Sequence, residues 1–266
     1  MTADPDLVLA ERRGAVLVLT LNRPDRLNAW TDPLEAAYFA RLDAAEADPE
    51  VRAIVLTGAG RGFCAGADFE VLEEATGEEP GRGIVERPRP RSFPLTLRKP
   101  LIAAVNGPAA GLGLVEALYC DVRFCVPRAK LTTAFARRGL IGEYGIAWLL
   151  PRLVGVSRAR DLLLSARIVL GEEAKEIGLV DFLVEPEDLL EQAVAYAADL
   201  AANCSPASIS IMKEQLADAL GEGFDESYEV AERLIRESFQ RPDAAEGVNS
   251  YLEKRPPAFP PLAPPA

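Results

Sequence analysis

The chain has 266 residues, of which 49% are apolar and 26% charged, and its formal net charge is −12. These values are typical of a soluble globular protein, and the acidic balance argues against nucleic-acid binding, which requires a basic face. The sequence contains no histidine, which excludes Ser-His-Asp and Cys-His catalysis, the HExxH zinc site and any acid–base role of an imidazole.

The first half of the chain predicts strands that alternate with helices. Val16–Leu21 is an apolar run typical of a strand, and a Thr-Asp-Pro start predicts a helix over residues 31–47. Two further buried strands, Val51–Thr57 and Leu101–Val105, each enter a glycine-rich turn, and Val122–Val126 is another short strand. Repeated strand–helix units of this kind predict an α/β core.

The composition changes twice along the rest of the chain. Residues 76–99, between the two glycine-rich turns, are rich in proline, glycine and alternating charge. Such a segment is typical of a long mobile loop, and we expect it to form one wall of a substrate pocket. From Pro186 onwards the pattern predicts helices over residues 186–203, 206–219, 224–239 and 243–254. This shift predicts a core of residues 1–197 and a helical region of residues 198–266.

The cysteines and the start of the chain indicate its surroundings. The four cysteines show no CxxC spacing, and three lie in apolar runs, which indicates buried free thiols in a reducing compartment. The start lacks a signal-peptide pattern, and no apolar run approaches the roughly 18 residues of a membrane span. We therefore expect a cytoplasmic protein with no membrane partner.

Two glycine-rich turns, each between a strand and a helix, are the main candidates for a site. They are Gly62–Asp68 (GFCAGAD) and Asn106–Leu114 (NGPAAGLGL). Glycine permits a tight turn, and the helix that follows begins with N–H groups that have no acceptor within the helix. Two converging turns of this kind would form an oxyanion hole. Each turn alone could equally be an ordinary tight turn, with Asp68 as a helix cap.

Taken together, these motifs resemble the crotonase superfamily, the enoyl-CoA hydratase/isomerase group. In family order and spacing, the chain carries LNRPDRLNAW, GAGRGFCAGAD, KPLIAAVNGPAAGLGLVEALYCDVRF, FARRGLIGEYGIAWLLPRLVG, GEEAKEIGLVD and EGVNSYLEKRPPAF. The resemblance covers the chain from Val16 to about Phe259. It implies an α/β fold of the crotonase type, a spiral of ββα units with a C-terminal helical trimerisation layer. It also implies a homotrimer or a hexamer.

The resemblance further implies that the ligand is an acyl-CoA thioester. Coenzyme A would be part of the substrate, so we expect no separate cofactor and no metal. The two oxyanion-hole donors would be the N–H groups of Ala67 and Leu112. Arg26 would contact a phosphate, although a solvated turn arginine is an equal alternative, and the Ala65 carbonyl would accept from the adenine amino group. The other expected substrate-binding residues are Leu27, Ala29, Gly66, Asp68 and Gly111.

The chain departs from the hydratase pattern of this family. The two hydratase glutamates would fall at Val115 and Phe135, and neither position carries a carboxylate. Glu116 is one residue away from the first of them. One step along a helix rotates a side chain by about 100°, so we expect Glu116 to be a surface or packing residue that points away from the site.

Glu143 is the remaining carboxylate, and it falls where some family isomerases keep a single Asp or Glu. One carboxylate in an apolar pocket can take a proton from C2 and return it at C4, which is the reaction of a Δ3,Δ2-enoyl-CoA isomerase. Several alternatives stay open. Glu143 could cap the helix that begins near Tyr144. The protein could be a hydratase that uses Glu143 with a water molecule, a non-catalytic acyl-CoA binding protein, or a scaffold that uses only its trimer surface.

Overall fold

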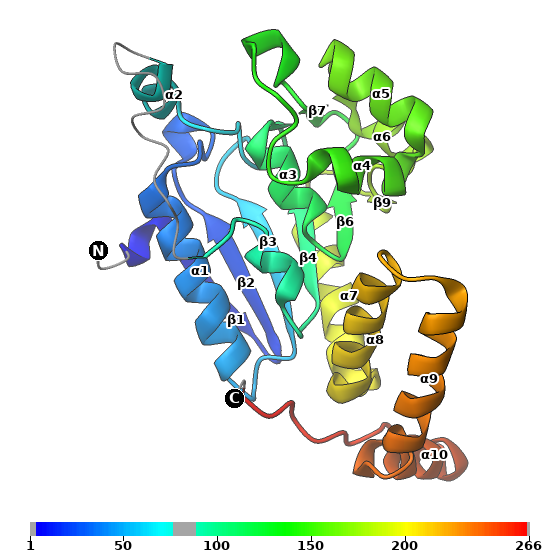
Figure 1. Ribbon diagram of the computed structural model, residues 1–266. Helices are drawn as coiled ribbons and strands as arrows, with labels where there is room; N and C mark the ends of the chain where they lie inside the picture. The colour runs from blue at the N-terminus through cyan, green and yellow to red at the C-terminus, as the bar shows by residue number, and fades with distance from the viewer. Residues whose placement is uncertain (1–3, 77–88, 265–266) are drawn as a thin grey trace.

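The computed structural model describes residues 4–76 and 89–264, and a six-stranded sheet forms its centre (Figure 1). The strand order is β1-β2-β3-β4-β6-β9. Strand β1 pairs antiparallel with β2, and all other neighbours in this sheet are parallel. The strands are β1 (Val8–Arg13), β2 (Val16–Leu21), β3 (Ala53–Gly58), β4 (Leu101–Val105), β6 (Val122–Cys125) and β9 (Phe182–Leu183).

The apolar runs of the sequence form the centre of this sheet. Every residue of β3 and β4 is buried, as is typical of parallel strands that are covered on both faces. Strands β2 and β4 have the predicted bounds, and β3 and β6 differ from their predictions by one or two residues at an end. The edge strand β1 was not predicted because five of its six residues are exposed or half-buried and its second half is charged.

Two long helices cover the sheet. Helix α1 (Asp32–Ala47) packs against β1 and β2, and the hydroxyl oxygen of its cap, Thr31, accepts from the N–H of Leu34 as predicted. Helix α7 (Leu189–Asn203) packs across β2, β3, β4 and β6 through small buried side chains such as Ala193 and Ala197. The predicted α/β fold is confirmed. The predicted boundary between the core and the C-terminal helical region, at residue 197, falls inside α7. This whole helix packs on the central sheet and belongs with the core.

A smaller sheet and several short helices complete the core. Strands β5 (Ala109–Ala110), β7 (Lys130–Thr132) and β8 (Val169–Leu170) form a three-stranded sheet, and β5 lies within the second glycine-rich turn. The other helices of the core are α2 (Phe69–Thr76), α3 (Leu112–Leu118), α4 (Ile146–Val154), α5 (Val156–Ser165), α6 (Gly171–Glu176) and the 3-10 helices η1 (Pro5–Leu7), η2 (Pro24–Arg26), η3 (Phe93–Thr96) and η4 (Ala136–Arg138).

The predicted mobile loop and the predicted free thiols can be compared with the structure in part. Residues 77–88, which make up half of the predicted mobile loop, lie outside the described residues. All four cysteines are free thiols, and three of them are buried, as predicted. In the described part of the chain, no helix has both the length and the apolar content that crossing a membrane requires.

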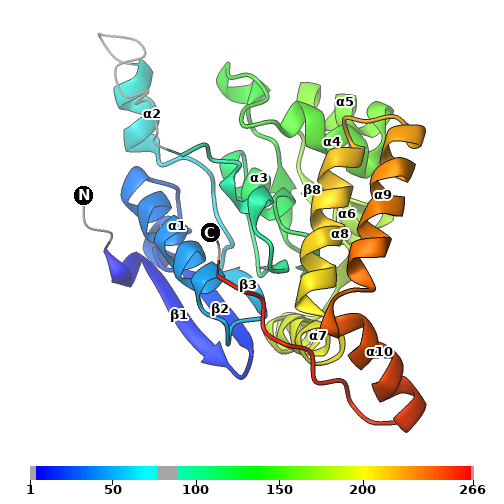
Figure 2. The same cartoon turned by 60° about the horizontal axis from the view of Figure 1, so that its bottom comes forward.

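Three C-terminal helices stand beside the core (Figure 2). They are α8 (Pro206–Ala219), α9 (Phe224–Ser238) and α10 (Pro242–Glu253), and α8 lies side by side with α9. Helix α9 has no buried residue, although its apolar side chains follow a helical repeat. Large apolar side chains are exposed on all three helices or just beyond their ends, including those of Leu216, Phe224, Ile235, Phe239 and Tyr251.

We expect this apolar layer to be buried by other copies of the chain, so that the protein is a trimer or a hexamer. In a single chain, the apolar side chains along α8 and α9 are exposed or only half-buried: Leu216, Leu220, Ile235 and Phe239 are exposed, and Ile209, Ile211, Val230 and Leu234 are half-buried. Multi-angle light scattering at micromolar concentration should therefore give three or six times the chain mass of 28.7 kDa. A mass equal to that of one chain would contradict the prediction.

Candidate active site

The two glycine-rich turns lie against each other and form the floor of a pocket. The N–H of Cys64 donates to the Pro108 carbonyl (3.1 Å), and the N–H of Ala110 donates to the Cys64 carbonyl (3.0 Å). This close approach requires glycine. A Cβ atom on Gly113 would lie 2.1 Å from the Cys64 carbonyl oxygen, and one on Gly66 would lie 2.6 Å from the Ala110 oxygen. The sequence thus brings residues 64–67 next to residues 110–113.

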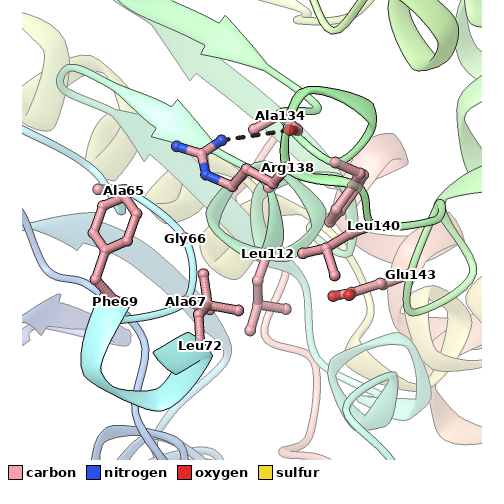
Figure 3. A pocket seen from close by; sticks show the side chains of 12 residues that line it. Ala65, Gly66, Ala67, Phe69, Leu72, Leu112, Ala134, Arg138, Leu140 and Glu143 are labelled. Atoms are coloured by element: carbon pink, nitrogen blue, oxygen red, sulfur yellow. Dashed lines mark hydrogen bonds between the residues drawn. The ribbon is translucent and has the colours of Figure 1, made fainter. Parts of the chain in front are cut away.

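Ala67 and Leu112, the two predicted donors, line the same pocket (Figure 3). Leu112 is the first residue of α3 and follows Gly111, which has a left-handed φ of 50°. Among the described residues, neither the Ala67 N–H nor the Leu112 N–H donates to a protein acceptor. Two free N–H groups from adjoining turns, at the wall of an apolar pocket, can stabilise negative charge on a bound carbonyl oxygen.

The first motif, LNRPDRLNAW at residues 21–30, is hydrogen-bonded to the first glycine-rich turn. The Leu27 carbonyl accepts from the N–H of Ala65 (3.0 Å), and the Trp30 N–H donates to the Gly66 carbonyl (2.7 Å). Ala65, Gly66 and Gly111 line the pocket, as predicted for substrate-binding residues, whereas Arg26, Leu27 and Ala29 do not. The Arg26 side chain is 62% exposed and pairs with Glu70 (3.3 Å).

Asn28 holds this motif in place, and the sequence reasoning assigned it no role. Its side-chain amide donates to the carbonyls of Ala59, Gly62 and Phe63 at 2.9–3.1 Å, and its Oδ1 accepts from the Arg23 N–H (2.8 Å). The residue is completely buried and has a left-handed φ of 55°. Asparagine tolerates this conformation better than most residues. Its place in the first motif was the signal that could have identified it.

Asp68 forms part of the scaffold beside the pocket. It is buried, pairs with Arg23 (2.9 Å) and accepts from the N–H of Glu70 (3.3 Å) at the start of α2. Burial alone would raise the pKa of Asp68, but the hydrogen bonds from Arg23 and Glu70 outweigh it and lower the pKa. Asp68 is not among the residues that line the pocket, and these contacts are those of the helix cap that the sequence left as an alternative.

Glu143 lies in the wall of the pocket, between Leu140 and the start of α4 (Figure 3). It is the only carboxylate among the described residues that line the pocket. Helix α4 begins at Ile146 with Gly145 as its cap and without a side-chain cap hydrogen bond, so the alternative that Glu143 caps this helix is wrong. Burial raises the pKa of Glu143, and the positive charge of Arg91 partly offsets that shift.

Comparison with known proteins shows the family. A model described as enoyl-CoA hydratase/isomerase matches residues 11–261. The chain belongs to this family. It is 37% identical to 1,2-epoxyphenylacetyl-CoA isomerase of Escherichia coli over 259 residues, which cover 96% of this chain and 98% of the relative. It is 34% identical to short-chain-enoyl-CoA hydratase of Clostridium acetobutylicum over 252 residues, covering 93% and 95%.

The fold agrees with solved structures of the family. The crystal structure of enoyl-CoA hydratase from Mycobacterium tuberculosis superposes with a TM-score of 0.83 at 30% identity, over 96% of this chain and 98% of that chain. The protein is therefore a crotonase-superfamily enzyme with the α/β fold that its motifs predicted.

At the two positions where the resemblance places the hydratase glutamates, this chain carries valine and phenylalanine. Val115 is completely buried in the core, and Phe135 lines the pocket with its ring. Both positions carry apolar side chains, so Glu143 is the only carboxylate among the described residues that line the pocket.

Glu116 takes the packing place that the sequence left open beside a surface one. It does not line the pocket, as predicted, but it is not on the surface: the residue is completely buried, and neither carboxyl oxygen has a hydrogen-bond partner among the described residues. The unpartnered hydroxyl of Tyr38 is buried too. Burial raises the pKa of Glu116 well above its usual range, and Glu35 adds to the shift. The buried environment therefore favours the neutral carboxylic acid over the carboxylate.

We expect Glu116→Gln to remove a pH-dependent loss of stability and to change activity little. The folded state favours the neutral acid, so above the usual glutamate pKa of about 4.3 each pH unit costs about 1.4 kcal/mol of folding free energy, until the raised pKa is reached. Glutamine does not titrate. The difference between the melting temperatures of the variant and the wild type should therefore shift in favour of the variant as the pH rises from about 5 to 8.

The matched control is Glu187→Gln, which changes an exposed glutamate. Its melting temperature should follow that of the wild type at every pH. Parallel curves for Glu116→Gln and the wild type would show that Glu116 is ionised in the folded protein.

Proposed function

We propose that this enzyme is an enoyl-CoA isomerase that converts a Δ3-unsaturated acyl-CoA thioester into the Δ2 isomer. The observation that carries the proposal is the pocket wall, in which one carboxylate, Glu143, accompanies the free N–H groups of Ala67 and Leu112. Hydration by the two-glutamate mechanism requires carboxylates where this chain has Val115 and Phe135.

The proposed mechanism moves one proton and no other atom. The thioester oxygen accepts hydrogen bonds from Ala67 and Leu112, which makes the C2 proton more acidic because the enolate charge develops on that oxygen. The Glu143 carboxylate takes the C2 proton and forms a carboxylic acid and a dienolate. The acid then returns the proton to C4, and the double bond moves into conjugation with the thioester.

The apolar pocket suits a group that must act first as a base and then as an acid. Burial raises the pKa of Glu143 towards neutral pH, the direction that suits a group which must first take and then return a proton. The lining around it is mostly apolar, with Leu72, Leu112, Phe135 and Leu140. These side chains would accept the hydrocarbon part of the acyl group.

We assign the coenzyme A end of the ligand to the first motif. Arg26 is exposed, and among the described residues its guanidinium pairs with Glu70 at the surface, where a phosphate could reach it. Leu27, Ala29, the Ala65 carbonyl and Gly66 would follow the pantetheine and the adenine. The name of the Escherichia coli relative, an isomerase of a CoA thioester, supports isomerisation over hydration.

A substrate panel tests the proposal. Purified enzyme is mixed with 2-enoyl-CoA and 3-enoyl-CoA thioesters of several chain lengths, and the products are followed by absorbance and mass spectrometry. Conversion of 3-enoyl-CoA at constant mass supports the isomerase. A mass gain of one water from 2-enoyl-CoA would replace it with a hydratase. Tight binding of both substrates without turnover would indicate a non-catalytic acyl-CoA binding protein.

A further inference from the structure

The turn that carries Glu143 has an unfavourable backbone conformation. Tyr144, directly after Glu143, has a left-handed φ of 52°, and Gly145 follows with a φ of 79°. Glycine accepts this region freely, but a tyrosine does so only where its surroundings hold it. The direction of the Glu143 side chain therefore depends on the contacts of its neighbour, Tyr144.

Two groups from distant parts of the chain hold Tyr144. From α3, the hydroxyl group of Tyr119 donates to the Tyr144 carbonyl oxygen. From the segment before η3, the guanidinium carbon of Arg91 lies 4.5 Å from the centre of the Tyr144 ring, which is a cation–π contact. One contact holds the backbone of this residue, and the other holds its side chain.

Arg91 is itself held rigidly. Its side chain is only 9% exposed, and its Nε donates to Glu35 Oε2 on α1 at 2.6 Å. The same oxygen accepts from the Trp30 indole N–H (3.0 Å), and Asp32 lies 3.6 Å from the guanidinium. Arg91 thus ties the pocket wall to α1, which packs on the central sheet.

We propose that Arg91 is a positioning residue for Glu143, which it anchors through the Tyr144 ring while its own positive charge acts on the Glu143 carboxyl group. The inference rests on the proposed function of Glu143 as the base. The charge of Arg91 partly offsets the effect of burial on the pKa of Glu143 and so favours the ionised carboxylate that can accept a proton.

The other titratable groups around this turn do not replace the positive charge of Arg91 beside Glu143. Burial raises the pKa of Glu116, on α3, and so favours its neutral form, and Glu35 is bound to Arg91 itself. Arg138 is directed towards the Phe69 ring and the Ala134 carbonyl. Besides Tyr119 and Tyr144, the remaining titratable groups on η4, α4 and α5 are Arg137, Arg152, Arg158, Arg160 and Asp161, which pairs with Arg167.

The test is Arg91→Met, which keeps an unbranched apolar stem and removes the charged guanidinium. The carboxyl titration of Glu143 is followed by ¹³C NMR on protein labelled with [5-¹³C]glutamate, with Glu143→Gln to identify the signal. Without the cation the pKa of Glu143 should rise further, because the charge that offsets the effect of burial is gone. A base works when deprotonated, so the rising limb of kcat/KM against pH should move to higher pH by the same amount.

Arg89→Met is the matched control. Arg89 lies two residues away on the same segment, but it pairs with Asp43 (2.8 Å) and stacks on Phe93 (4.0 Å). This variant should titrate as the wild type does. Arg91→Lys keeps the charge but loses the planar contact, and it should restore the wild-type midpoint with a lower kcat. Equal Glu143 midpoints in Arg91→Met and the wild type would overturn the proposal.

Two results separate this inference from the function on which it rests. If Glu143→Gln keeps full activity, the proposed function fails, whereas the NMR titration still reports whether Arg91 acts on Glu143. If Arg91→Met does not fold, Tyr144→Leu tests the anchor instead, because this variant removes the aromatic ring that the Arg91 guanidinium contacts. We expect its kcat to fall about tenfold with KM and the pH midpoint unchanged. An unchanged kcat would overturn the anchor.

Discussion

Glu143→Gln should lower the rate of double-bond isomerisation by about 10²–10⁴-fold and change the affinity for acyl-CoA by only a few-fold. Glutamine keeps the shape of the side chain and much of its hydrogen bonding, but it cannot take the proton from C2. The ligand would still be bound by the two glycine-rich turns and by the first motif, none of which contains Glu143. The measurement is steady-state turnover of 3-enoyl-CoA, together with calorimetric titration of a CoA thioester.

The pH dependence of the wild type should agree with this role. Burial raises the pKa of Glu143, so kcat/KM should still be rising with pH above the usual glutamate range of about 4.3. Glu116→Gln is the control, since it changes a buried glutamate on α3 that does not line the pocket. Full activity of Glu143→Gln would contradict the assignment of the base.

Gly66→Ala should lower kcat by about 10²–10³-fold, the usual effect of losing one oxyanion-hole donor. Gly66 has a φ of 93°, and an added Cβ would lie 2.6 Å from the Ala110 carbonyl oxygen and 3.7 Å from the Leu112 nitrogen. Both neighbours are backbone atoms, so the two turns must move apart. That movement displaces the N–H of Ala67 relative to that of Leu112.

The control for this variant is Gly14→Ala. Gly14, in the turn between β1 and β2, also has a left-handed φ, 62°, but an added Cβ there would have nothing within 4 Å. It should lose stability from backbone strain, by about 1–2 kcal/mol, and keep its kcat. Thermal melting and kinetics on both variants distinguish the effect of backbone strain on stability from the effect of displaced oxyanion-hole donors on kcat. Equal kcat values in the two variants would argue against the oxyanion hole.

Much of this protein can be read from local patterns. Strands β2 and β4 and helix α8 have the predicted bounds, because continuous apolar runs and Pro-led helix starts act on the chain locally. The meeting of the two glycine-rich turns could also be predicted, since their glycines mark places where backbones approach closely. The motifs around them were sufficient to indicate the family.

Other features depend on residues that are far apart in the sequence. The antiparallel strand β1 is charged and exposed, and its pairing with β2 decides its structure more than its own composition does. Glu116 was expected at the surface or in packing, and only the fold shows that α1 and α3 enclose it beside Tyr38. No local pattern reports the burial of one charged residue on a short helix.

The surroundings of Glu143 show most clearly which features the sequence determines and which features only the tertiary structure decides. Its residue type and its motif were sufficient to propose it as the base. Its pocket and the burial that raises its pKa come from the packing of distant segments. The contacts that hold its turn come from Tyr119 and Arg91, which lie 24 and 52 residues earlier in the chain. Contacts of this kind leave no periodic signal in a single sequence, because they depend on how the helices and loops pack around the sheet.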